Sequence, residues 1–485
     1  MRLSLFFLIS FTAAQFAVAQ NSIDQAIQKL KNDAELNNAI MSIAVLDASN
    51  GNKLAGFQSS YSVSSASTAK LFSTAAAIEL LGADYRPRTR IYVNGNIENG
   101  VLLGDLIIRG GGDVSLGSRF FNNEGQEVDF LTTWVTKIQE LGITKIAGKL
   151  IADGSEFGYS GAPDGWSWSD MGNYYGAGPS GITCFDNAIR YYFKTGGIAG
   201  QRSELTGMFP HVSELLFRNE VVADKVSGDN SYIFGAPFSY DRFATGSLPL
   251  NQSRFEVKGS LPDPEHQLAI EFGKALEQRG IHIENGAIGY RRSGVKVKIP
   301  YEGCTLLFEH KGASVLEIAT LTNMKSINLF AEGLVCLIGY EKGGKGTTEE
   351  GLKQIESYLS KKMNYQGLYL KDGSGLSRSN GISADHFTQL LYVMHGSVNA
   401  QKFKSTLPVA GKSGTLSSLC KGQAGEGRIA AKSGTMSRIK SYAGYAKTAS
   451  GKELIFSITI TNYNCSNSAV TKKMEQVLNA ISMHN

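Results

Sequence analysis

The feature that most constrains the fold is an interruption: the middle of the chain follows a different pattern from its two ends. Between about residues 92 and 262, short strand-like segments alternate with Gly and Asn turns, as in IYVNGNIENGVLLGDLIIRGGGD. Within that stretch, residues 130–141 have the apolar spacing of a helix. Both flanking parts combine helical periodicity with strand-like runs. This pattern predicts an α/β (α+β) domain that is interrupted by a mainly β insertion.

The flanks give the expected elements and boundaries. We predict a helix over 22–36, a hairpin of strands 41–47 and 53–57, and a helix that ends near Gly82. Further along we predict helices near 268–281, 314–339 and 346–362, a hairpin around 449–451, and a last helix from about residue 468. The domain would consist of residues 20–90 and 281–485, and residues 91–280 would form an insertion of two small subdomains.

The first residues have the pattern of a secretory signal peptide. A short positive start, Met1-Arg2, precedes an apolar core, and Ala17-Val18-Ala19 is a small-x-small cleavage site. The segment is too short for a membrane span, and no later stretch reaches 18 apolar residues. We therefore expect cleavage after Ala19 and a periplasmic or otherwise exported mature protein without a stable membrane span.

Composition and missing motifs exclude several functions. The net charge is only +5 in 485 residues, without a basic block, so we expect no nucleic-acid partner. No Cys-x-x-Cys or His-Glu-x-x-His pattern is present, so we expect no metal and no cofactor. The five cysteines are far apart; one bridge is conceivable, between Cys420 and Cys465. A Gly-x-Ser-x-Gly nucleophile turn is also missing.

An exported hydrolase of this kind needs another base for a serine, and Ser67-Thr-Ala-Lys70 offers one. Residues i and i+3 share a helix face, so the lysine can reach the hydroxyl and act as a base if it is buried. The Ser-x-x-Lys pattern occurs four times, but only Ser67 opens a long apolar helix. We interpret the lysines that follow Ser293, Ser418 and Ser437 as solvated side chains.

Two further patterns follow in the chain. Ser326 and Asn328 flank Ile327 between two helical segments, so a non-helical link would point both side chains into one cleft. Lys-Ser-Gly-Thr occurs twice. The copy at Lys412 leads into Gly-rich loop sequence, whereas the copy at Lys432 continues a strand and precedes a hairpin. We assign the chemistry to Lys432, Ser433, Gly434 and Thr435, where the glycine permits a close approach of substrate.

In this order, the three patterns resemble the penicillin-binding and serine β-lactamase superfamily. Longer stretches resemble one family within it, the D-alanyl-D-alanine carboxypeptidase/endopeptidases (class C low-molecular-mass penicillin-binding proteins of the DacB type, peptidase family S13). These stretches are Arg109-Gly-Gly-Gly-Asp113, DGWSW at 164–168 with YYGA at 174–177, DGSGLSR at 372–378, and LPVAG at 407–411. The chain departs from the family pattern at two places. It has Ser-Ile-Asn at 326–328 where the family has Ser-Asp-Asn, and Val114-Ser115 where the family has Pro-Thr.

The resemblance implies a serine β-lactamase/transpeptidase-like fold and a D-Ala-D-Ala carboxypeptidase with DD-endopeptidase activity on peptidoglycan stem peptides. It implies Ser67 as the acylated nucleophile, Lys70 as its base, and Ser326 and Lys432 as a proton path to the leaving amine. Asn328 would hold the substrate amide, and the backbone N–H groups of Ser67 and Thr435 would form the oxyanion hole.

For the substrate itself, the resemblance implies that Ser433, Gly434, Thr435 and Asp113 bind it, and that β-lactams are covalent inhibitors. Two alternatives stay open: a serine β-lactamase or esterase on the same scaffold, and a non-catalytic peptidoglycan-binding protein.

Overall fold

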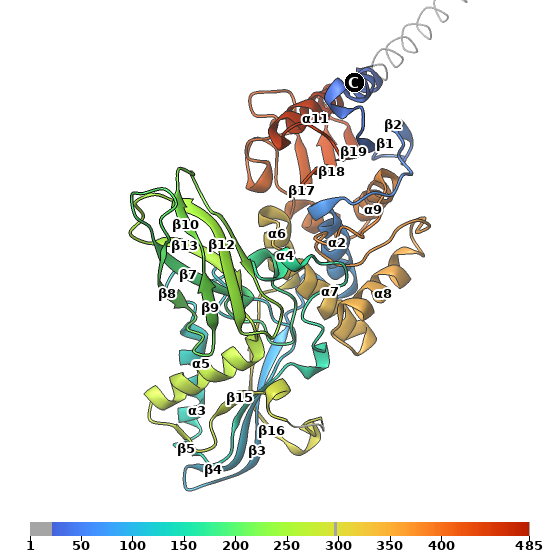
Figure 1. Cartoon of the computed structure of the whole chain (residues 1–485). Helices are drawn as coiled ribbons and strands as arrows, with labels where there is room; N and C mark the ends of the chain where they lie inside the picture. The colour runs from blue at the N-terminus through green and yellow to red at the C-terminus, as the bar shows by residue number, and fades with distance from the viewer. Residues whose placement is uncertain (1–21, 295–297, 485) are drawn as a thin grey trace, which may run out of the picture. The chain divides into compact units, whose positions relative to one another are not determined.

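The computed structural model describes residues 22–294 and 298–484, so the expected signal peptide at 1–19 lies outside the described residues. The chain forms two compact units (Figure 1). The first unit consists of residues up to Ala83, Ala319–Ile327 and Leu352–Asn485, and the second of Asp84–Ile318 and Asn328–Gly351. Within the described ranges, no helix is both long and apolar enough to span a membrane.

The first unit is built on a five-stranded antiparallel sheet in the order β17-β18-β19-β1-β2. The strands are β17 (Ile429–Met436), β18 (Ile439–Lys447), β19 (Glu453–Thr461), β1 (Ile40–Asp47) and β2 (Lys53–Phe57). β19 reads ELIFSITIT and is buried over nearly its whole length, as expected for a central strand that is covered on both faces. The two predicted hairpins, β1–β2 and β18–β19, are confirmed.

Helices cover this sheet. Residues 22–31 are helical and pack with α11 (Asn467–Ser482) into one apolar core with the sheet. α9 (Ala384–His395) packs against β1, β18 and β19, and contacts α2 (Lys70–Leu80) through Phe387 and Phe72. The short α10 (Ala400–Ser405) lies against α2 and α9. The predicted helix 22–36 is divided, because Asp33 caps a separate 3-10 turn, Ala34–Leu36.

The second unit contains three sheets. A seven-stranded sheet holds β3 (Arg88–Glu98), β4 (Val101–Arg109), β5 (Lys145–Ile146), β6 (Leu150–Asp153), β14 (His282–Ile283), β15 (Ala287–Gly289) and β16 (Thr305–Lys311). A second sheet has the order β13-β7-β8, from Phe255–Ser260, Ala188–Lys194 and Glu204–Phe209. In the third, β12 (Asp241–Pro249) pairs with β11 (Asn230–Phe234), β10 (Val222–Asp224) and β9 (Leu216–Asn219).

The helices of this unit are α3 (Asp129–Glu140), the short α4 (Trp168–Met171), α5 (Pro264–Gln278) and α7 (Asn328–Gly343). α6 (Val315–Lys325) and α8 (Thr348–Leu359) each cross the boundary between the units. The mainly β insertion is thus confirmed. One apolar core joins residues of all three sheets, for example Ile91, Tyr191 and Leu248, and the division of the insertion into two subdomains stays a prediction.

The predicted domain boundaries also differ from those of the structure. β14, β15 and β16 follow residue 280, yet they pair with β5, β6 and β3 of the insertion. The insertion therefore continues to Ile318, and α7 belongs to the same unit. The sequence could not reveal this, because a strand's pairing partner is a tertiary property.

All five cysteines lie among the described residues and are free, so the suggested Cys420–Cys465 bridge is wrong.

Candidate active site

Ser67 and Lys70 lie at the start of the first long helix of the first unit. Ser67 is in the 3-10 turn Ala66–Ala69, and Lys70 is the first residue of α2. The Lys70 Nζ donates to Ser67 Oγ at 2.9 Å and to the Ser374 carbonyl at 2.7 Å. The Lys70 side chain is fully buried. The spacing of three residues therefore puts a buried amine directly on the serine hydroxyl.

The turn that carries Ser67 is held from β18. The Ser441 hydroxyl donates to the Ser65 carbonyl at 2.5 Å and lies 3.0 Å from the Thr68 hydroxyl, which itself bonds the same carbonyl. Ala66 has a positive φ of 49°, a strained value for a residue with a Cβ. The surrounding hydrogen bonds fix this backbone and thereby the direction of the Ser67 side chain.

The DGSGLSR stretch shapes the loop that receives Lys70. The buried Asp372 carboxylate accepts from the backbone N–H groups of Gly375 and Ser377 and from the Asn380 amide. This arrangement presents the Ser374 carbonyl to Lys70. The stretch therefore acts on the nucleophile indirectly, by positioning its neighbouring lysine.

Ser326 lies in the non-helical link between α6 and α7, as the sequence predicted, and has a φ of 61°. Its Oγ accepts a hydrogen bond from Lys432 Nζ at 3.0 Å. One turn earlier, the buried Asn323 amide donates to Thr74 of α2 at 3.2 Å and to Thr406 at 2.8 Å. This bond to α2 ties the end of α6 to the helix that holds Lys70.

Lys432 is a fully buried cation on β17. Burial lowers its pKa well below the usual lysine value, and the charges of Lys70 and Lys440 lower that pKa further. Its Nζ donates to Ser326 Oγ and to the Ser433 carbonyl, and among the described residues it makes no ion pair. Two neighbouring buried lysines oppose each other's charge, so the site favours a state in which one amine is neutral.

Gly434 explains how β17 approaches the Ser67 turn. A Cβ at this position would lie 2.4 Å from the Ser65 carbonyl, 2.4 Å from Ser441 Oγ and 3.0 Å from the Ser67 nitrogen. Two of these three atoms belong to the backbone, so a side chain could not be accommodated by a rotamer change. Only glycine lets the strand lie beside the Ser67 backbone amide.

The two Lys-Ser-Gly-Thr copies lie next to each other. Thr415 of the first copy accepts a hydrogen bond from Ser433 of the second at 2.8 Å. Lys412 is exposed and pairs with Glu426 at 2.8 Å. The first copy is therefore a loop, as predicted, but it is a loop that supports the second copy.

Lys440 was missed by the sequence analysis. It follows Ser437 in a Ser-x-x-Lys pattern that we interpreted as solvated, but its Nζ is partly buried on β18 and donates to Thr435 Oγ1 at 2.8 Å. Burial lowers the pKa of Lys440, and no described carboxylate pairs with it. The signal that could have identified Lys440 is the register of the β17–β18 hairpin, which pairs Thr435 with Lys440; the sequence analysis did not predict this hairpin.

Lys421, after Ser418, is exposed as predicted, and the lysine after Ser293 lies outside the described residues.

Two predicted site residues lie in the second unit. Asn328 begins α7, and its Nδ2 donates to the Tyr175 carbonyl at 2.8 Å. Asp113 is only 1% exposed and accepts from both the backbone and the hydroxyl of Ser115. Burial raises the pKa of its carboxyl. The expected substrate contact of Asp113 is not supported, because its carboxylate is buried in its own turn.

No group of three or more His, Cys, Asp or Glu side chains in the described ranges could hold a metal ion. The arrangement contains a serine with an adjacent amine, a second serine with an adjacent amine, and a strand with two hydroxyls and excess positive charge. Chemically, this suits acyl transfer from a substrate that carries a carboxylate.

Comparison with known proteins identifies relatives of the whole chain. The model of the D-Ala-D-Ala carboxypeptidase 3 (S13) family matches residues 23–482. A D-alanyl-D-alanine carboxypeptidase of Actinomadura sp. (strain R39) is 30% identical over 445 residues, which cover 89% of this chain and 79% of that protein. The D-alanyl-D-alanine carboxypeptidase DacB of Haemophilus influenzae is 25% identical over 422 residues, 85% of this chain and 83% of that protein.

A solved structure shows the same fold. The crystal structure of penicillin binding protein 4 (dacB) from Haemophilus influenzae superposes with a TM-score of 0.78 at 20% identity, covering 94% of this chain and 99% of that one. The same protein complexed with a β-lactam gives a TM-score of 0.74 at 18% identity, with the same coverage. The expected fold class is thus confirmed.

Proposed function

The chain belongs to the D-Ala-D-Ala carboxypeptidase 3 (S13) family, and from this premise we propose that Ser67 is the nucleophile of a penicillin-binding D-Ala-D-Ala carboxypeptidase. The observation that carries the assignment is the 2.9 Å hydrogen bond from Lys70 Nζ to Ser67 Oγ. It lies where Gly434 lets β17 come close to the Ser67 backbone nitrogen. The substrate is a peptidoglycan stem peptide that ends in D-Ala-D-Ala.

In the first step, Ser67 Oγ attacks the carbonyl carbon of the penultimate D-Ala. Lys70 in its neutral form takes the hydroxyl proton, and a C–O bond forms while the carbonyl π electrons move to the oxygen. The backbone N–H groups of Ser67 and Thr435 donate to this oxyanion; each such donor contributes roughly 3 kcal/mol in comparable sites. The closeness of Gly434 to the Ser67 nitrogen supports this pairing.

In the second step, the C–N bond breaks and the terminal D-Ala leaves as an amine. The Ser326 hydroxyl donates the proton that the leaving nitrogen needs, and Lys432, at 3.0 Å, replaces it. The lowered pKa of Lys432 suits a group that gives up and regains a proton during the reaction. Water then attacks the acyl-enzyme and releases the shortened peptide and the free serine.

The terminal carboxylate of the substrate binds along β17. Ser433 and Thr435 offer hydroxyl donors, and Lys432 and Lys440 supply charge that no described carboxylate neutralises. A bound carboxylate would in turn stabilise the ammonium forms of these lysines. Asn328 would hold the substrate amide, following the family pattern. The same chemistry cleaves the D-amino-acid cross-link between two stems, so we also propose DD-endopeptidase activity in an exported, cell-wall-facing enzyme.

The test is labelling of the purified mature chain with a fluorescent penicillin, followed by identification of the modified peptide. We expect a slowly released label on Ser67 and its loss in Ser67→Ala. Ser418→Ala is the matched control, because Ser418 is also followed by a lysine three residues later and should leave labelling unchanged. Labelling that survives Ser67→Ala would contradict the assignment, and rapid turnover of penicillin would favour a β-lactamase instead.

A further inference from the structure

A second candidate binding site lies wholly within the second unit, on the sheet formed by β9, β12 and β11. It is an open groove of about 980 Å³ at the start of α4 and the ends of these strands. We call it the aromatic groove; its lining includes Trp168, Phe217, Arg218, Phe234, Asp241 and Phe243. Trp168 is 56% exposed. Soluble domains seldom leave large aromatic side chains open to water unless the patch has a function.

The rings of this groove form a row across the sheet. Phe234 lies opposite Phe243 in the β11–β12 register, and Phe243 lies opposite Arg218 in the β12–β9 register. Trp168 and Phe234 have ring centroids 6.5 Å apart at 29°, and Phe234 and Phe243 are 6.1 Å apart at 25°. The guanidinium of Arg218 lies 4.4 Å from the Phe243 ring centre. Since the planes are nearly parallel, the rings stack in one row that ends at the solvent-exposed Trp168.

Polar groups accompany the row. Arg242 lines the groove and is only 2% exposed, yet its Nε has no hydrogen-bond partner. Its Nη1 donates to the carbonyls of Ala236, Ser239 and Asp241, and its Nη2 to the Ser260 carbonyl at 3.4 Å. These bonds hold the guanidinium in place within the lining of the groove. The charged lining is mixed, with Asp241 beside two arginines, so it does not select a strongly anionic surface.

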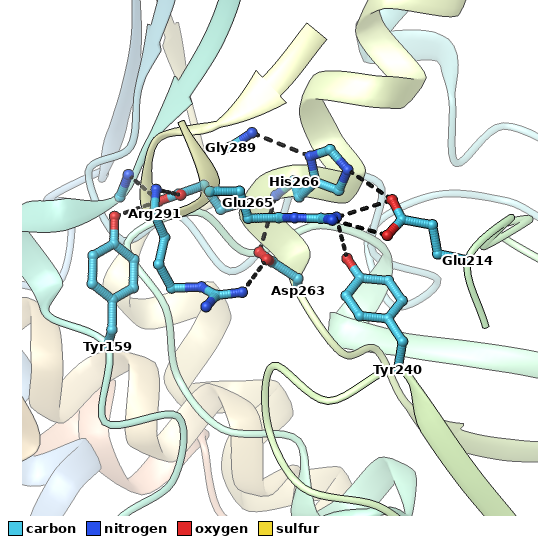
Figure 2. Close-up of polar contacts among 10 residues, drawn as sticks. Tyr159, Glu214, Tyr240, Asp263, Glu265, His266, Gly289 and Arg291 are labelled. Atoms are coloured by element: carbon cyan, nitrogen blue, oxygen red, sulfur yellow. Dashed lines mark hydrogen bonds and ion pairs between the residues drawn. The ribbon is translucent and has the colours of Figure 1, made fainter. Parts of the chain in front are cut away.

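The walls of the groove are fixed by a polar cluster, which Figure 2 shows. Arg292 donates to both carboxylate oxygens of Glu214 at 3.0 and 2.9 Å, and to the Tyr240 hydroxyl at 3.3 Å. Glu214 is also 3.5 Å from His266, whose Nδ1 accepts from the Gly289 backbone. Glu214 precedes the β9 wall, and Tyr240 lies between the two lining residues at 239 and 241. Fixed walls reduce the ordering cost of binding.

We propose that the aromatic groove binds the glycan strand of peptidoglycan, a β-linked chain of N-acetylated amino sugars; this inference rests on the proposed function. A pyranose ring has an apolar C–H face that packs on an aromatic ring, while its edge carries hydroxyl and acetamido groups. The exposed ring of Trp168 matches the first feature, and Arg218 and Asp241 in the lining match the second. A neutral sugar polymer also fits the mixed charge better than an anionic membrane surface, which would select a basic cluster.

The chain offers its own reporter for this binding. It has three tryptophans, and Trp134 and Trp166 are 1% and 6% exposed, so Trp168 is the solvent-facing one. Titration of the full mature chain with an N-acetylglucosamine oligomer, and with peptide-free glycan strands, should shift the tryptophan emission to shorter wavelength. Trp168→Phe should remove the shift while calorimetry still detects binding. Trp168→Ala should weaken binding at least about fivefold, since it removes one stacking face.

Activity separates this inference from the proposed function. Trp168→Ala should lower D-Ala release from intact peptidoglycan but leave release from a soluble D-Ala-D-Ala tripeptide and penicillin labelling unchanged. Ile198→Ala, at a position 70% exposed on the same unit but outside the groove, is the matched control and should change none of these. Loss of penicillin labelling in the wild type would instead refute the proposed function.

Three results would overturn the glycan assignment. The first is the absence of glycan binding by a chain that labels normally with penicillin. The second is binding to anionic phospholipid vesicles, without glycan binding, that Trp168→Ala abolishes. The third is a dimer in sedimentation analysis that Trp168→Ala dissociates, because the groove would then be an interface between copies of this chain.

Discussion

Lys440 provides the sharpest quantitative prediction of the proposed chemistry. A substrate carboxylate oxygen that accepts from the Thr435 hydroxyl lies about 2.7 Å beyond it. Since Lys440 Nζ is itself 2.8 Å from Thr435 Oγ1, the carboxylate lies within about 5 Å of the ammonium. At an effective dielectric constant of about 20 to 80, this attraction is about 1–3 kcal/mol. Lys440→Met should therefore raise the KM about 5- to 150-fold.

The change should appear in KM and not in kcat. The carboxylate does not change its charge when Ser67 attacks the neighbouring carbonyl, so its attraction to Lys440 is about equal in the ground and transition states. The assay is D-Ala release from a D-Ala-D-Ala peptide, compared with acylation by the same peptide with a C-terminal amide. Lys440→Met should cost little with the amide, and Lys440→Arg should restore most of the affinity for the acid.

Lys447→Met is the matched control, because Lys447 is exposed at the other end of the same strand. It should leave both substrates unaffected. An equal loss with the acid and the amide would refute the reasoning, since a charge effect requires the carboxylate. No loss with either substrate would refute it as well.

Other consequences concern the nucleophile, the strand contact and stability. Gly434→Ala should slow penicillin acylation by at least about 100-fold, measured by stopped-flow labelling, because its Cβ would meet two backbone atoms of the Ser67 turn and displace one oxyanion donor; normal acylation would contradict this. The KM for the acid peptide should rise as pH rises through the lowered pKa of Lys440, because the ammonium loses its charge there. In Lys440→Arg the KM should stay nearly constant over the same pH range, because the guanidinium keeps its charge. Burial raises the pKa of Glu265 to about 7, so the folded state binds a proton that the unfolded state releases. Its contribution to the free energy of unfolding is complete below about pH 4.5 and is lost as pH rises to about 7, a change of about 3 kcal/mol. Denaturant titrations at several pH values should show this slope in the wild type and not in Glu265→Gln, whatever the variant's absolute stability; an unchanged slope would contradict the assignment.

Much of the site could be read from the sequence because its signals are local. Ser67 and Lys70 are separated by one helical turn, so helix geometry alone brings the two side chains together. The sequence places Ser326 and Asn328 between two helical segments, and residues 326–327 form a non-helical link between α6 and α7. The strand context separated the two Lys-Ser-Gly-Thr copies for a similar reason, since a following hairpin is a short-range pattern.

Other parts were inaccessible because they depend on contacts between distant segments. Lys440 is not one of these parts: it is five residues from Thr435, and a hairpin predicted at Ser437-Arg438 would have paired the two. The Ser374 carbonyl that receives Lys70 is 304 residues away in the chain. The contact of Asp113 with substrate stays a prediction; the burial of this carboxylate comes from the packing of the insertion and leaves no trace in the local sequence.

The sequence by itself determined the chemical type of this protein. Short-range geometry fixes the serine–lysine pair, the broken helix and the catalytic strand, and the order of these patterns identifies the family. The tertiary structure decided where the insertion ends, which backbone atoms enclose Ser67, and that a row of aromatic rings from α4, β11 and β12 lies on a separate sheet. The physical reason is that helix and hairpin periodicity are encoded within a few residues, whereas strand partners, burial and lowered lysine pKa values arise only when distant segments pack together.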